Sequence, residues 1–90
     1  MANRKLPEGL TLEQAIGRIL RKERLDRSLR QIDVAVATNF AVRSIRTMEL
    51  GKQSMTIRSL DALALFYRLP IEEVIIRAKR LRNRMLREKA

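Results

Sequence analysis

The chain has 90 residues, with 20 Lys plus Arg against 10 Asp plus Glu, and a formal net charge of +10. It contains neither Cys nor His, which excludes disulfides, thiolate metal sites and the commonest general base, so we expect no metal, no cofactor and no enzymatic activity. The basic excess favours a polyanionic partner. One Tyr and two Phe are too few for base-stacking platforms, which favours double-stranded DNA over single strands or RNA loops.

The length fits one domain with a small helical core. No apolar run approaches about 18 residues, and the N-terminus lacks the apolar segment of a signal peptide. We therefore expect a cytoplasmic, nucleoid-associated protein with no membrane segment.

Residues 1–10 are polar and are predicted to form a flexible N-terminal arm, in which Arg4 and Lys5 either lie along a phosphate backbone or have no role. A helix is predicted from Thr11 to about residue 25, because Thr11 and Gln14 have capping-box spacing and apolar residues follow at helical intervals. Gly17 lowers the helix propensity of this segment by about 1 kcal/mol relative to Ala. A close approach of another helix would explain it.

The stretch QIDVAVATNFAVRSIRTMELG, residues 31–51, predicts two short helices, over about 30–37 and 41–50, joined by a turn at Asn39. Either Ser28 or Arg30 caps the first of them. The buried side of the second is predicted to carry Val42, Ile45 and Met48, and Gly51 stands where a helix C-terminus prefers glycine.

A fourth helix is predicted to start after Thr56, its N-cap, and to run to about Tyr67, with Ile57 on its apolar face, and Pro70 precedes a fifth. The fifth helix has heptad-spaced apolar residues and becomes strongly basic after residue 76. It either pairs with a partner helix, folds back on the domain or frays. The predicted fold is all-α with five helices: a helix-turn-helix domain over 11–76 and a basic helical extension over 77–90.

Arg24, Gln31, Ala35, Glu49 and Gly51 occur at the intervals typical of one family. In this register the stretch from residue 16 to 75 resembles the phage repressor and Cro-type (XRE-like) helix-turn-helix family. The resemblance implies a lambda-repressor-like fold whose third helix enters the DNA major groove. It also implies that Arg24 and Glu49 form an internal, structural ion pair.

The resemblance further implies that Gln31 contacts phosphate and base edges, while the third helix reads bases and flanking cations hold the backbone. The DNA-contacting residues predicted on this basis are Gln31, Val42, Arg43, Ser44, Arg46, Thr47, Lys52 and Arg58. Arg30, which stands where the family commonly has Ser, is predicted to add a phosphate contact. Three residues depart from the usual pattern at the turn, namely Asn39, Phe40 and Ala41, the last being an inferior helix cap.

The family implies a homodimer that uses the fourth and fifth helices. The predicted function is therefore a small dimeric repressor or dual regulator from a phage, plasmid or other mobile element. Two alternatives stay open at this point. One is a helix-turn-helix protein that works mainly through a protein partner, as an antitoxin or antiactivator; the other is a non-specific architectural or RNA-binding protein.

Overall fold

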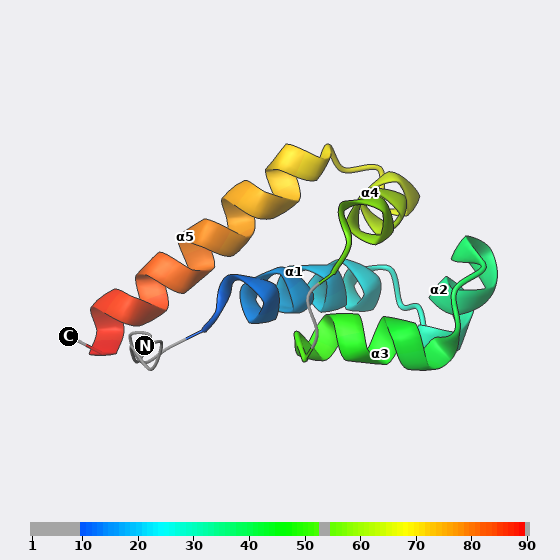
Figure 1. Cartoon of the computed structure of the whole chain (residues 1–90), viewed down its shortest axis with the longest axis horizontal. Coiled ribbons are helices and arrows are strands. Elements are labelled where there is room, and N and C mark those ends of the chain that lie inside the picture. Colours follow the sequence, from blue (N-terminus) through cyan, green and yellow to red (C-terminus); the bar gives the residue numbers. More distant parts are fainter. Residues whose placement is uncertain (1–9, 53–54, 90) are drawn as a thin grey trace.

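The computed structural model describes residues 10–52 and 55–89, and within those ranges it contains five α-helices and no strand. Figure 1 shows α1 in the middle of the molecule, with α3 along one side of it and α5 along the other. The all-α, five-helix prediction is confirmed. The helices are α1 (Leu12–Asp26), α2 (Gln31–Thr38), α3 (Val42–Leu50), α4 (Ile57–Phe66) and α5 (Ile71–Lys89).

Local side-chain caps begin two of these helices where the sequence predicts them. The Thr11 hydroxyl accepts a hydrogen bond from the Gln14 amide at 3.1 Å, and the Gln14 side chain accepts one from the Thr11 amide at 3.0 Å. Thr56 caps α4 by accepting from the amide of Ser59 at 3.0 Å. The alternative that Ser28 caps α2 is wrong: Ser28 has φ 56°, its amide bonds to the Leu25 carbonyl, and it therefore closes α1 instead.

The turn between α2 and α3 is built without glycine. Asn39 ends α2 in the left-handed region with φ 62°, which Asn tolerates better than most residues. The amide of Phe40 bonds to the Ala35 carbonyl at 3.1 Å, and the Phe40 side chain packs against the core. Gly51 ends α3 with φ 66°. Asn39, Phe40 and Ala41, which depart from the usual pattern, are therefore compatible with a compact helix-turn-helix.

The core lies between α1 and its two main neighbours, α3 and α5, and it continues between α2 and α4. Gly17 lets α3 approach closely, because a Cβ at this position would lie 2.6 Å from the Met48 carbonyl oxygen. The close approach expected from Gly17 is confirmed. The buried apolar side chains are Ala15, Ile16, Leu20, Val34, Ala35, Ile45, Met48, Leu60, Leu63, Ala64, Tyr67, Val74 and Ala78.

The fifth helix is continuous from Ile71 to Lys89 and folds back antiparallel along α1 (Figure 1). Val74 and Ala78 are completely buried in this contact. Of the three arrangements left open for this helix, the structure has the one in which it returns onto the domain. None of the helices in the described part of the chain is long and apolar enough to span a membrane.

Some apolar positions of the sequence pattern lie at the surface. Ile57, predicted on the apolar face of α4, is 72% exposed because it starts the helix beyond the edge of the core. Val42, predicted on the buried side of α3, is 37% exposed at the first position of that helix. The predicted arm over residues 1–10 falls outside the described residues except for Leu10, which packs against the core.

Candidate nucleic-acid interface

The outer face of α3 carries positive charge that no acidic group in the described part of the chain neutralises. Helical spacing places Arg43 and Arg46 away from the buried residue Ile45, and both arginines are exposed. Lys52 follows the end of the helix and is exposed as well. Among the described residues none of these three cations forms an ion pair. One open surface hollow is lined by Val42, Arg43, Arg46, Thr47, Leu50 and Lys52.

Leu50 lines this hollow although it is not among the residues predicted to contact DNA. It lies seven residues after Arg43, which is nearly two helical turns, so both occupy the same face of α3. It is 49% exposed. Its spacing from Arg43 could have identified it. An exposed leucine beside two arginines offers an apolar contact, such as one to a thymine methyl group.

A buried ion pair ties α1 to the end of the helix-turn-helix. Arg24 of α1 donates through Nε and Nη2 to the two carboxylate oxygens of Glu49 in α3, at 2.7 and 2.9 Å. A third nitrogen, Nη1, donates to the Leu29 carbonyl at 2.9 Å. Hydrogen bonding to Glu49 raises the pKa of Arg24 above its ordinary value, so the guanidinium stays charged. This bidentate geometry holds α3 against α1.

Gln31 is part of the same network. Its side-chain amide Nε2 donates to Oε1 of Glu49 at 3.1 Å, which orients Gln31 at the first position of α2. The amide group keeps a second N–H and a carbonyl oxygen for other partners. Gln31 therefore links the beginning of α2 to the end of α3.

The remaining predicted contact residues lie around this face rather than in one cluster. Arg30 caps α2 and its guanidinium pairs with Asp33 at 2.9 Å, which lowers the pKa of that carboxyl group. Arg58 is exposed on the first turn of α4 and does not line the α3 hollow. Ser44 and Thr47 line a second hollow between α3 and the start of α4, and the Thr47 hydroxyl donates to the Ser44 carbonyl at 3.1 Å.

The chemistry available on this face is recognition of an anion. Arginine presents a planar fork of N–H donors to phosphate or to guanine, and lysine presents a point charge. Among the described residues, no group of three or more His, Cys, Asp or Glu side chains is placed to hold a metal ion.

The fold and this face define an all-α helix-turn-helix domain. No protein-family model and no curated protein sequence matches the chain. The solved structures that match include two crystal structures of the clp gene regulator ClgR from Corynebacterium glutamicum. One has a TM-score of 0.72 with 21% identity, covering 78% of this chain and 91% of that chain. The other has a TM-score of 0.73 with 21% identity, covering 79% and 76%. At this identity the likeness concerns the fold.

Proposed function

We propose that this protein is a sequence-specific, double-stranded DNA-binding transcriptional regulator that docks α3 in the major groove. The observation that carries the proposal is the set of cations on the outer face of α3, namely Arg43, Arg46 and Lys52, which have no acidic partner among the described residues. The net charge of +10 and the fold shared with a gene regulator support it. We infer a binding protein, without enzymatic activity, that works in the cytoplasm at the nucleoid.

In the proposed complex, Arg43 and its neighbours read base edges while the flanking groups hold the backbone. A bidentate Arg–guanine pair contributes about 1–3 kcal/mol of discrimination. Gln31 lies at the start of α2, where the free amides and the helix dipole favour a phosphate. Lys52 and Arg58 stand on either side of the segment between α3 and α4 and would contact further phosphates. Arg24 and Glu49 are buried and hold the helices in place.

We further propose that the regulator is a homodimer that uses α4 and α5. Leu65 on α4 is 67% exposed, and Ile76 on α5 is exposed as well, so each helix presents an unpaired apolar side chain. A two-fold dimer would read half-sites about one DNA turn apart. Repressors or dual regulators of phages, plasmids or other mobile elements have this architecture in the family that the sequence resembles.

The second candidate function is action through a protein partner, as an antitoxin or antiactivator. The observation that favours it is the outer face of α2, where Ile32 and Val36 are exposed, Val36 by 75%. These side chains would suit an apolar partner surface. The charge on α3 favours DNA.

The deciding experiment measures the affinity of the full chain for its own promoter region and for random duplex DNA over a range of salt concentrations. We expect a specificity ratio of at least about 10³. Arg43→Ala should relax base preference, whereas Lys52→Ala should weaken binding to all sequences alike. Arg87→Ala, an equal loss of charge on α5, is the control. Unchanged base preference in Arg43→Ala would refute the recognition role of α3. Equal affinity for every sequence would indicate architectural binding, and no binding would favour the protein partner.

A further inference from the structure

A second basic hollow lies between α1 and α5. Ile19 of α1 and Leu81 of α5 are partly buried and form its apolar floor. The rim is basic and comes from both helices. Its exposed basic residues are Arg18, Lys22, Arg80 and Arg84. We call this hollow the α1/α5 groove.

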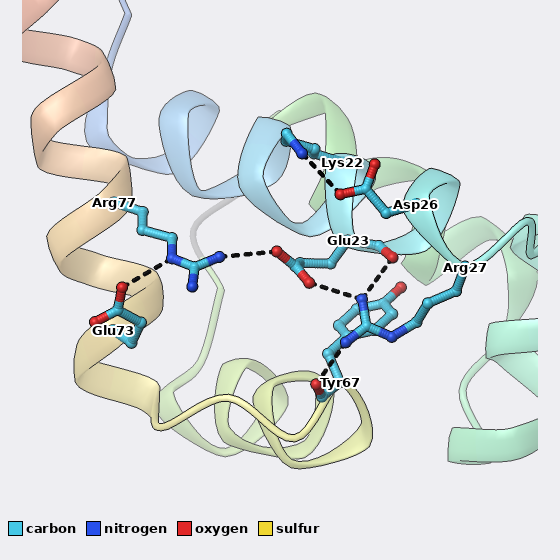
Figure 2. Close-up of polar contacts among 7 residues, drawn as sticks. All are labelled: Lys22, Glu23, Asp26, Arg27, Tyr67, Glu73 and Arg77. Carbon is cyan, nitrogen blue, oxygen red and sulfur yellow. Dashed lines mark hydrogen bonds and ion pairs between the residues drawn. The ribbon is translucent and has the colours of Figure 1, made fainter.

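At one end of the groove the acidic side chains are all engaged in the ion pairs that Figure 2 shows, those of Glu23, Asp26 and Glu73. Glu23 of α1 accepts from Arg77 of α5 at 2.9 Å through one carboxylate oxygen and from Arg27 at 2.7 Å through the other. Arg77 also pairs with Glu73 at 2.8 Å, and Lys22 pairs with Asp26 at 2.7 Å. These carboxylates are therefore not available to the rest of the rim.

The rest of the rim keeps an excess of positive charge. Arg18, Arg80 and Arg84 form no ion pair within the described part of the chain. The guanidinium of Arg18 lies 3.8 Å from the sulfur of Met85, a contact that leaves its charge uncompensated. Three arginines from two helices thus surround an apolar floor.

The groove and the recognition helix lie on opposite sides of α1. Gly17 and Arg24 are two of the α1 residues in contact with α3. Ile19 follows Gly17 by two positions and Lys22 precedes Arg24 by two, and two positions correspond to about 200° around an α-helix. A ligand bound along α3 would therefore leave the α1/α5 groove open.

We propose that the α1/α5 groove binds an acidic amphipathic helix of another protein. Apolar side chains of such a helix, spaced by three and four residues, would pack on Ile19 and Leu81, while its carboxylates pair with Arg18, Arg80 and Arg84. The sugar–phosphate backbone of DNA has no apolar stripe to cover the floor. The homodimer proposed above uses Leu65 and Ile76, which do not line the groove, and two copies joined through the groove itself would bring basic rims of like charge together. The inference goes beyond DNA binding and does not depend on it.

Fluorescence anisotropy of the full-length protein with a labelled model peptide tests the proposal. The probe has Leu at intervals of three and four residues and Glu at the other positions. Two peptides serve as controls: a scrambled sequence of the same composition, and one of equal charge in which Gln replaces Leu. We expect the probe to bind at least tenfold more tightly than either control.

Protein variants then locate the site. Arg80→Glu with Arg84→Glu should weaken probe binding at least tenfold, and the milder Arg80→Gln with Arg84→Gln should weaken it less. Arg43→Glu with Arg46→Glu, the matched charge reversal on α3, should leave it within twofold. All of these side chains are exposed, so thermal midpoints near that of the original chain would show that the variants are folded.

Three results would overturn the proposal. The first is equal binding of the probe and the Leu-free peptide, which would show a general attraction for polyanions. The second is a loss of affinity for random duplex DNA in the Arg80/Arg84 variants with no loss for the probe, which would make the groove a nucleic-acid surface. The third is self-association that disappears in the same variants, measured by sedimentation without peptide, which would make it a contact between copies.

Discussion

Gly17 of α1 lies directly against the backbone carbonyl of Glu49 in α3. The contact brings the backbones of two helices together at the residue whose side chain pairs with Arg24. The absence of a side chain at position 17 therefore sets the distance across which the buried ion pair forms.

Gly17→Ala is expected to destabilise the protein by about 1–3 kcal/mol, because a Cβ would lie 2.6 Å from the Met48 carbonyl oxygen and backbone cannot rotate away. An isolated helix would gain about 1 kcal/mol from the same change. The midpoint of urea unfolding measures the balance. An unchanged or higher midpoint would mean that α1 and α3 are further apart than the structure has them.

Arg24→Met is expected to lower the free energy of unfolding by about 3–5 kcal/mol, because it leaves the buried Glu49 carboxylate without its cation. Adding Glu49→Met should recover part of the loss, since no buried charge is then left unpaired. Lys22→Met removes one partner of the exposed pair with Asp26 and should change stability far less. Chemical denaturation of the four proteins gives the comparison. Equal effects of Arg24→Met and Lys22→Met would contradict the structural role of the buried pair.

Ala41→Ser is expected to stabilise the protein by about 1 kcal/mol. Ala41 is the N-cap of α3 with φ −69° and ψ 146°, and it supplies no side-chain hydrogen bond. Serine fits this backbone and would accept a bond from a free amide of the first turn. The reverse change, Thr56→Ala, removes the existing cap of α4 and should lower stability by a similar amount. Calorimetric midpoints of both variants test the pair, and a destabilised Ala41→Ser would show that the site excludes a hydroxyl.

Arg68→Gly is expected to raise stability by about 0.5–1 kcal/mol. Arg68 has φ 60°, a left-handed backbone conformation that is strained in any residue with a Cβ. Glycine, which has no Cβ, adopts this conformation freely. As the control, Arg21→Gly places glycine inside α1 and should lower stability by about 1 kcal/mol. Both are exposed arginines, so the loss of charge is the same. Thermal midpoints that fall in both variants would contradict the positive φ at residue 68.

Tyr67 makes the folded protein sensitive to alkaline pH. Burial, together with the nearby Glu49 carboxylate, raises the pKa of Tyr67 to about 12. The unfolded chain releases this proton near pH 10, so the unfolded state is favoured as pH rises from about 10 to 12. Stability should therefore be full below pH 10 and about 1.4 kcal/mol lower at pH 11.

Tyr67 is the only tyrosine, so the absorbance of its phenolate follows the titration directly. The variant Tyr67→Phe should lose this part of the alkaline destabilisation and keep whatever the lysines contribute. A Tyr67 that titrates near 10 in the folded protein would mean that water reaches the phenol.

The positions of the helices could be predicted from the sequence because their signals are local. Thr11 and Thr56 bond to amides three residues away, and Asn39 and Gly51 adopt the left-handed conformations that end helices. The sequence predicts less well which face of each helix is buried. Ile57 and Val42 fit a 3.6-residue period yet are exposed, since periodicity shows which residues share a face and not whether another helix covers it.

The sequence by itself determined an all-α chain with a helix-turn-helix register and an unusual excess of positive charge. The contact roles of Gln31, Arg43 and the other residues inferred from the family stay predictions. Only the tertiary structure decided that α5 returns along α1, that Glu23 is shared by Arg27 and Arg77, and that a basic groove opens opposite α3. Caps and turns depend on residues three to five positions apart, whereas contacts between α1 and α5 join residues up to 67 positions apart, and their geometry depends on how the helices pack.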